Sequence, residues 1–394
     1  FRFHQNEYLA EVSSEARQNG QLLPHLLVWR GGFGDLTVPN AAASQHSLYY
    51  STSDNKLVVN DADAAEDGPI TQEGHYSFAG LEDAYFAAVA VPPDGATLTM
   101  RTFTDVLPAA ASGRTGEAPH AGAGIGGHGR NSFPLYVGPK DLDLLKQVDP
   151  KLVQIVDFGW FSFLAKPLFL ALKWTYGRWV ENWGWAIVIL TLAINIVMFP
   201  LKLTSLKSMK KMQALQPEVK KIQDKYKGLS LRDPKKQQQN EELMALYQKH
   251  GVNPMGGCLP MALQIPFFIA FYKVLTVAIE LRGADWLWVT DLSQPEHLPI
   301  RILPVTMVAS QFLMQKMTPT TAVGSPGQQR IMYMMPLMMG FLFYGVSSGL
   351  VLYWLTSNIV GIVQQHLINK MGGQAGVPAP AAAEVKPRRK ERKH

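Results

Sequence analysis

The sequence predicts a membrane protein in which a water-soluble β domain is followed by a bundle of five transmembrane helices. Residues 1–157 carry 10 basic and 19 acidic side chains, whereas residues 158–394 carry 27 basic and 12 acidic ones. The acidic part has no apolar run near the roughly 18 residues needed to cross a bilayer. The basic part has several such runs, separated by charged connectors. The average composition, with 47% hydrophobic residues, does not distinguish the classes, so this distribution decides the prediction.

The acidic part alternates short β-prone runs with Gly, Pro and Asp, which is typical of an antiparallel β-sandwich. The clearest runs are residues 46–50, 56–59, 85–91 and 97–104. Residues 122–127 match the pattern GxGxxG, but a dinucleotide site needs a strand before it and a helix after it. We therefore interpret residues 109–131 as a loop. Position 1 is Phe, and we expect the natural chain to begin earlier, with an anchoring helix.

The basic part begins with a segment suited to the bilayer surface. Residues 158–178 mix aromatic and basic side chains and predict an amphipathic interfacial helix. The first core transmembrane helix is predicted at residues 179–201, with its apolar core at 185–201. Four further transmembrane helices are predicted within residues 253–370, at 260–279, 298–314, 331–344 and 350–368, with a turn at 346–349.

The connector at residues 202–252 predicts a helical hairpin. Its apolar residues recur at spacings of three and four, as one face of a helix requires: Leu206, Met209, Met212, Leu215, Val219, Ile222 and Tyr226. Asp233 and Pro234 are a favourable start for a second helix. Residues 202–250 hold 12 basic and 5 acidic side chains, whereas the only charges at 283–299 are acidic. The positive-inside rule therefore places the hairpin and the basic tail, residues 371–394, in the cytoplasm and the β domain outside.

The sequence offers little chemistry for an enzyme. It has no hydrolase motif, and the single Cys258 has no partner for a disulfide or a CxxC metal site. We therefore expect no catalysis, no cofactor and no metal. The apolar helices instead carry uncharged polar residues, which are costly where they face lipid. These residues predict either a wet groove or hydrogen bonds that join helices. The groove candidates are Thr191, Asn195, Gln264, Gln311, Gln315, Ser357 and Asn358.

Four segments resemble the YidC family of membrane protein insertases. They read NWGWAIVILTLAINIVMFPL (182–201), NPMGGCLPMALQIPFF (253–268), QKMTPTT (315–321) and SSGLVLYWLTSNIV (347–360). The resemblance covers residues 132–370. It implies a periplasmic β-supersandwich domain, five conserved transmembrane helices and a place in the bacterial inner membrane. It also implies a hydrophilic groove, open to cytoplasm and lipid, that accepts polar parts of a nascent membrane segment.

The resemblance implies roles for particular residues. Thr191 and Phe268 occupy motif positions that contact client proteins. Asn195 stands where the family usually has an arginine. Either Lys202 or another basic side chain supplies the positive charge, or groove polarity alone suffices. Trp354 stands where the family often has tyrosine, which keeps an aromatic client contact.

The expected partners are nascent membrane-protein segments, the ribosome, components of the Sec translocon and the phospholipid bilayer. The basic residues expected to approach the ribosome or anionic lipid are Lys207, Lys210, Lys211, Lys220 and Lys221 in the hairpin and Arg388, Arg389 and Lys390 in the tail. A polytopic transporter or channel is the main alternative, but the sequence shows no inverted repeat. A carbohydrate-binding role for the β domain is a further alternative, without paired carboxylates to support catalysis.

Overall fold

The computed structural model describes residues 1–5, 7–31, 33–34, 45–108, 117–228, 233, 235–253, 259–317 and 326–372. The chain divides into two compact units. The first unit comprises Phe1–Thr191, Met261–Pro304 and Phe341–Tyr353, and the second comprises Leu192–Pro260, Val305–Gly340 and Trp354–His394.

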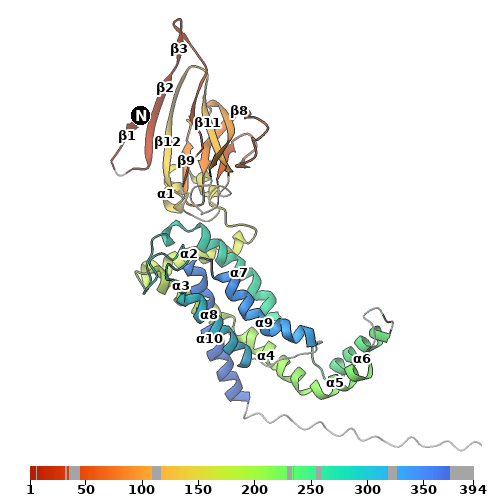
Figure 1. Cartoon of the computed structure of the whole chain (residues 1–394). Helices are drawn as coiled ribbons and strands as arrows, with labels where there is room; N and C mark the ends of the chain where they lie inside the picture. Colours follow the sequence, from red (N-terminus) through yellow and green to blue (C-terminus); the bar gives the residue numbers. More distant parts are fainter. Residues whose placement is uncertain are drawn as a thin grey trace, which may run out of the picture. The chain divides into compact units, whose positions relative to one another are not determined.

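The amino-terminal part of the first unit is an antiparallel β domain (Figure 1). Ten strands form one sheet in the order β1-β2-β12-β9-β8-β10-β11-β5, and β6 joins β7 to β8 beside this path. The remaining strands, β3 and β4, pair with each other. The strands are β1 (Arg2–Phe3), β2 (Leu9–Glu15), β3 (Arg17–Gln18), β4 (Gln21–Leu22), β5 (His25–Trp29), β6 (His46–Ser51), β7 (Lys56–Asp61), β8 (Ile70–Glu82), β9 (Phe86–Ala90), β10 (Thr97–Pro108), β11 (Glu117–Gly127) and β12 (Arg130–Pro139).

The long strand β8 holds the two halves of this sheet together. Its first residues, Ile70 to His75, pair with β10, whereas its later residues pair with β6 and β9. The two halves share one core, formed by Val12, Tyr49, Leu81, Met100, Ile125 and Phe133 among others. The predicted antiparallel β domain is therefore confirmed, as a sheet that closes over its core like a half-barrel.

The predicted loop around the GxGxxG pattern is wrong, because these residues form β11. The strand pairs with β10 from Glu117 to Gly126, which is all but its last residue. Small residues are needed because neighbouring backbone lies close: a Cβ atom on Gly126 would lie 2.2 Å from the carbonyl oxygen of His25. Glycine in a strand often marks such a close approach. Because a glycine-rich segment resembles a loop in sequence, the pattern did not predict this strand. Residues 109–116 lie outside the described residues.

We predict that Gly126→Ala destabilises the β domain, whereas Gly127→Ala does not. The backbone of β5 cannot yield to a new methyl group at position 126, and overpacking of this kind costs about 1–3 kcal/mol. The nearest atom to a Cβ on Gly127, the oxygen of Thr97, lies 3.5 Å away, which is ordinary contact. Hydrogen exchange of β10 and β11 in the full chain measures both variants. Equal protection in the two would contradict the predicted packing.

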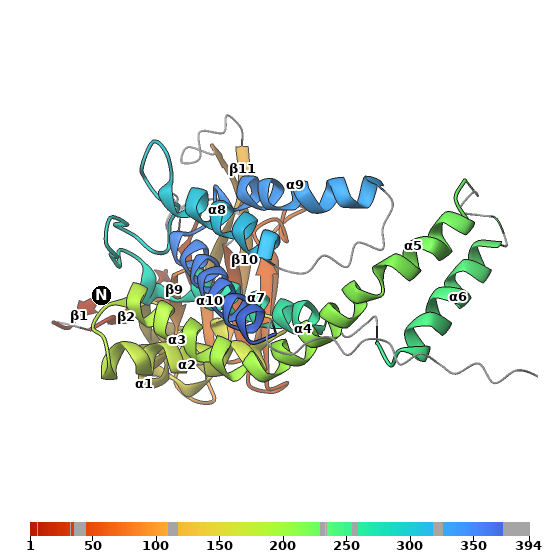
Figure 2. The same ribbon diagram turned by 90° about the horizontal axis from the view of Figure 1, so that it is seen from below.

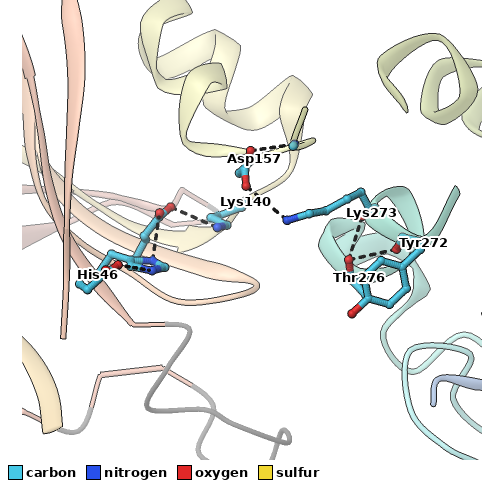
Figure 3. A network of polar contacts seen from close by, with 9 residues as sticks. His46, Lys140, Asp157, Tyr272, Lys273 and Thr276 are labelled. Atoms are coloured by element: carbon cyan, nitrogen blue, oxygen red, sulfur yellow. Dashed lines mark hydrogen bonds and ion pairs between the residues drawn. The ribbon is translucent and has the colours of Figure 1, made fainter. Parts of the chain in front are cut away.

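Two groups of charged side chains lie within the first unit. Lys140 Nζ lies 3.1 Å from Glu82 Oε2, and both side chains are buried. His46 Nδ1 lies 3.6 Å from the other Glu82 oxygen. Separately, Lys273 Nζ donates to Asp157 Oδ2 at 3.4 Å, as Figure 3 shows. Since a buried charge needs a partner, the pairing with Glu82 lets the Lys140 side chain be buried, whereas the pair of Lys273 and Asp157 is more exposed.

His120 on β11 is a buried histidine that favours the neutral form. Its Nδ1 lies 2.9 Å from Oε1 of Gln45. Burial lowers the pKa of His120 below the ordinary 6.5, partly opposed by the carboxylate of Asp105. The unfolded chain therefore binds a proton at a higher pH than the folded chain does.

We predict that the β domain loses stability as pH falls below about 6.5, the unfolded pKa of histidine. Neutral His120 contributes its full share to the free energy of unfolding above that pH. This contribution decreases as the pH falls towards the lowered pKa of His120 in the folded state. Hydrogen exchange of β11, corrected for intrinsic rates at pH 7.5 and 5.5, measures this loss. The His120→Asn variant should show a smaller difference between the two pH values. An unchanged difference would assign the acid sensitivity to other groups.

The first unit continues with helices whose starts follow ordinary capping rules. Helix α1 (Leu142–Val148) begins after Asp141, whose carboxylate accepts hydrogen bonds from the amides of Asp143 and Leu144. The 3-10 helix η2 (Pro150–Ile155) and helix α2 (Ser162–Arg178) follow. On α2, Leu168, Phe169 and Leu172 are buried whereas Phe163, Leu170 and Trp174 are exposed. An exposed aromatic stripe is what the predicted interfacial helix requires.

The second unit contains a pair of helices that pack against each other. Helices α4 (Phe199–Ala214), α5 (Gln216–Lys225) and α6 (Lys235–Lys249) occupy the predicted hairpin. Both views show α5 beside α6 (Figure 2). Their shared core consists of Met212, Leu215, Val219, Tyr247 and Val252, with Leu243 and Leu246 packed against it. The carboxylate of Asp233 accepts from the amide of Lys235 at 2.9 Å, which is the predicted helix start. Pro234 lies outside the described residues.

Each of five apolar helices has residues in both units. They are α3 (Trp183–Val197), α7 (Leu259–Val277), α8 (Ile302–Met317), α9 (Pro326–Phe343) and α10 (Ser348–Gly372), and the short η4 (Ile279–Leu281) follows α7. Within the described residues, none of these helices is by itself both long and apolar enough to cross a membrane. The bent pair α3 and α4 meets that criterion together, with an angle of 51° at the break.

The predicted extent of the first core helix is wrong at its carboxyl end. We expected one apolar helix to run to Leu201, but α3 ends at Val197 and α4 begins at Phe199. Pro200 lies in the first turn of α4. Proline has no amide hydrogen to continue α3 and is tolerated in the first turn of a helix, so it ends one helix and opens the next.

Candidate functional site

Polar residues on helix α3 turn away from its exposed face. Thr191 is fully buried, and its hydroxyl donates to the carbonyl of Ile187 at 2.6 Å. Asn195, one turn later, is only 3% exposed. On the same helix Ile196 is 60% and Val197 80% exposed. Helix α3 therefore has a polar side that is enclosed by protein and an apolar side that is exposed.

A lysine from the next helix reaches Asn195. The ammonium group of Lys202 donates to Oδ1 of Asn195 at 2.7 Å, and the lysine side chain is half-buried. Lys202 lies in the first turn of α4, beyond the 51° bend that follows α3, and its long side chain extends back to Asn195. The structure thus brings a positive charge to the position of Asn195.

Helix α10 contributes a further contact at the end of α3. The amide nitrogen of Gln364 donates to the carbonyl oxygen of Asn195 at 3.1 Å, and Gln364 is buried. The end of a helix leaves carbonyl groups without intrahelical donors, so a side-chain donor is favourable there. We did not select Gln364 from the sequence. Its spacing of seven residues from Ser357, matched by Gln365 and Asn358, is the signal that could have indicated it.

Helices α8 and α10 are joined by side-chain hydrogen bonds. The indole of Trp354 donates to Oε1 of Gln311 at 3.2 Å. The amide of Asn358 donates to the hydroxyl of Ser310 at 3.0 Å. Close packing accompanies these bonds, because a Cβ atom on Gly361 would lie 2.9 Å from the sulfur of Met314. For Asn358 these contacts favour the interhelical hydrogen-bond interpretation.

Two other candidates, Gln315 and Ser357, lie on these helices and are half-buried. Gln315 is half-buried on α8, one turn after Gln311. Ser357 is half-buried on α10, and its hydroxyl oxygen is shielded from solvent without a hydrogen-bond partner among the described residues.

The candidates in the first unit form a separate aromatic group. The amide of Gln264 donates to the hydroxyl of Tyr353 at 3.1 Å. The Tyr353 ring stacks on Phe271 with centroids 4.4 Å apart, and it is almost fully buried. Phe268 lies 6.0 Å from Phe343, ring centre to ring centre. Tyr353 was not predicted from the sequence as the hydrogen-bond partner of Gln264.

The candidate residues therefore fall into two sets. The second unit brings together Asn195, Lys202 and Gln364, and also Gln311 with Trp354 and Ser310 with Asn358. The first unit brings together Gln264, Tyr353, Phe271 and the nearby aromatic rings. The hydroxyl of Thr191 donates to the carbonyl of Ile187 on its own helix.

The predicted basic residues of the hairpin are mostly exposed. Lys207, Lys211, Lys220 and Lys221 face solvent, and Lys210 is half-buried with its ammonium group 3.4 Å from the carbonyl of Ile368. The predicted tail residues Arg388, Arg389 and Lys390 lie outside the described residues.

Comparison with known proteins assigns both parts of the chain to one class, inner-membrane proteins with a periplasmic domain. Residues 174–374 match the family described as 60Kd inner membrane protein. Residues 1–171 match the family described as YidC periplasmic domain. The chain belongs to the YidC family, as the motifs of its helices indicated.

Individual relatives agree with this assignment. A membrane protein insertase YidC from Dechloromonas aromatica is 36% identical over 96% of this chain and 69% of its own length. The namesake from Wolinella succinogenes is 50% identical over 60% of this chain, and the chain spans 42% of that relative's length. A crystal structure of an active YidC insertase matches 89% of this chain and 82% of its own chain, at 21% identity and a TM-score of 0.43.

Proposed function

We propose that this chain is a membrane protein insertase that helps nascent inner-membrane proteins enter the bilayer. The observation that carries the proposal is the enclosed polar group of Asn195, Lys202 and Gln364 on helices whose opposite faces are apolar and exposed. Relatives that bear the name membrane protein insertase YidC support it, and they disfavour the transporter or channel alternative.

The proposed topology has five spanning segments and a cytoplasmic hairpin. Helices α3, α7, α8, α9 and α10 would cross the inner membrane, with residues 1–157 in the periplasm. The 12 basic side chains of residues 202–250 support the cytoplasmic side for the hairpin, and the acidic loop at 283–299 supports the outer side for that loop. The turn between α9 and α10 would then face outward and the carboxyl-terminal tail inward.

The proposed mechanism lowers the cost of moving a polar segment through hydrocarbon. Unsatisfied polar groups are expensive in lipid. A client tail that exchanges water for the hydrogen-bonding groups of Asn195, Gln264, Gln311, Gln315, Ser357 and Asn358 avoids much of this cost. Thr191, Phe268 and Trp354 are proposed as further client contacts in the same groove. Apolar parts of the client would meanwhile slide along the exposed apolar faces of the helices. No cofactor and no bond-breaking step is required.

The basic surfaces suggest partners on the cytoplasmic side. The exposed lysines at positions 207, 211, 220 and 221 would approach ribosomal RNA or anionic lipid, and the tail would add to this charge. Cooperation with the Sec translocon is proposed from the family resemblance.

The first test is photo-crosslinking from positions 195, 264 and 354 to a stalled nascent chain with a polar tail and one transmembrane segment. We expect these positions to capture the polar tail. Ile196, Ile265 and Ile359 are matched controls, because they lie on the same three helices and are at least half exposed. They should capture lipid or the apolar segment. If the isoleucine positions react while the three polar positions stay silent, the polar residues only join helices.

A second test concerns the charge of Lys202. We predict that Lys202→Ala reduces insertion of a client with an acidic tail several-fold, because a half-buried ammonium group attracts a carboxylate more strongly than a solvated one does. Lys202→Arg should retain insertion, and a client with a neutral tail should be unaffected. Lys316→Ala, which removes an exposed lysine from α8, is the control. Equal losses for acidic and neutral tails would show that Lys202 supports the fold instead of attracting charge.

A further inference from the structure

A two-residue hairpin displays a leucine in the loop between α7 and α8. Trp286 and Val289 exchange both backbone hydrogen bonds, each at 2.8 Å, so that Leu287 and Trp288 form the tip. Leu287 has a φ of +51°, a conformation in which glycine is favoured. The other non-glycine residues with positive φ in the described chain are both asparagines, Asn19 and Asn55. A branched apolar side chain therefore occupies a strained position at this tip.

Packing within the core does not explain this leucine, because its side chain is 63% exposed. The next residue, Trp288, is 42% exposed. Strained residues that persist are held by their surroundings and often mark a function. The tip thus presents two large apolar side chains to the outside of the protein.

The base of the hairpin is fixed firmly to helix α3. Trp286 is buried, and its ring lies edge-on to Trp185 with centroids 5.6 Å apart. A Cβ atom on Gly184 would lie 2.2 Å from the Trp286 ring, so only glycine permits this contact. The side chain of Asn182 also donates to the carbonyl of Asp285 at 2.9 Å. The hairpin is therefore a rigid projection from the end of α3.

A buried carboxylate connects the tip to helix α8. Glu296, which is 4% exposed, accepts a hydrogen bond from the indole nitrogen of Trp288 at 2.5 Å. Its other oxygen accepts from the amide of Leu303 in the first turn of α8 at 2.9 Å. The one polar atom of the Trp288 side chain is thus satisfied by protein, which leaves its ring face for an apolar environment.

We propose that Leu287 and Trp288 form a lipid anchor that inserts into the boundary between headgroups and acyl chains of the outer leaflet. Tryptophan is enriched at this depth of membranes. Trp185 and Trp179, at the amino-terminal end of α3 and just before it, are also exposed and would continue the same belt. Because the hairpin is fixed to α3 and linked to α8, its insertion would set the depth of both helices. The proposal rests on the proposed outer position of residues 283–299.

A zwitterionic lipid surface fits the tip better than an anionic one. The flanking charges are Asp285 and Asp291, while the tip itself has no charge. Anionic headgroups would be repelled by these carboxylates, whereas the ammonium group of phosphatidylethanolamine would not. The anchor is therefore expected to favour the abundant zwitterionic lipid.

The test places an environment-sensitive NBD probe at position 287 by the Leu287→Cys substitution in a Cys258→Ser background. The full chain is reconstituted in vesicles of phosphatidylethanolamine and phosphatidylglycerol. Lipids with a doxyl group near the headgroup should quench the probe, and aqueous iodide should quench it several-fold less than a probe at Val106. Val106 is the control for water, since it is 57% exposed on β10, and Phe341, 87% exposed on α9, is the control for lipid.

The controls separate failure of the anchor from failure of the topology. If position 341 is shielded while iodide quenches positions 287 and 106 alike, the lipid anchor is wrong and the spanning helices stand. If iodide also reaches position 341, both proposals are overturned. A photo-reactive residue at 287 in cells gives an independent readout. Lipid adducts support the anchor, whereas an adduct with another protein would assign the tip to a protein interface instead.

Discussion

The structure depends on the rule that a polar group on an apolar helix must have a partner. The end of α3 shows this most clearly, because the helix stops at Val197 with Pro200 just beyond. Lys202 donates a hydrogen bond to the side-chain oxygen of Asn195, and Gln364 donates one to its backbone carbonyl. In a bilayer no water could replace these bonds, so the same contacts that stabilise the break also create an enclosed polar environment. Stability and the proposed client path thus arise from one arrangement.

The same rule operates at the ends of the helices and in the β domain. Glu296 satisfies both an indole and a helix start, and Glu82 pairs with the buried Lys140. Lys273, the one charge within an apolar run, finds Asp157 in the segment that follows the β domain. The pairs of Glu82 with Lys140 and of Asp157 with Lys273 connect segments that are 58 and 116 residues apart in sequence. These two ion pairs therefore connect separate segments of the first unit.

Much of the architecture could be predicted because it follows from local patterns. The strands at 46–50, 56–59, 85–91 and 97–104 were confirmed within one or a few residues. The start of α6 at Asp233 followed from capping rules. The two errors have physical causes. The glycines of β11 resemble a loop in sequence but permit close strand packing, and Pro200 divides an apolar run that hydropathy treats as continuous.

The sequence by itself determined the division into an acidic β domain and a basic helical part, the family and the residues able to hydrogen-bond within the helices. It could do so because charge, hydropathy and capping act over a few neighbouring residues. The sequence also indicated Lys202, seven residues away, as a source of positive charge near Asn195. Only the tertiary structure decided that Gln364 contacts Asn195, that Tyr353 accepts a hydrogen bond from Gln264, and that Leu287 stands at a strained and exposed tip. These pairings join residues up to 169 positions apart, and no local pattern specifies them. They depend on how helix faces pack, which is settled only when the whole chain excludes water from its core.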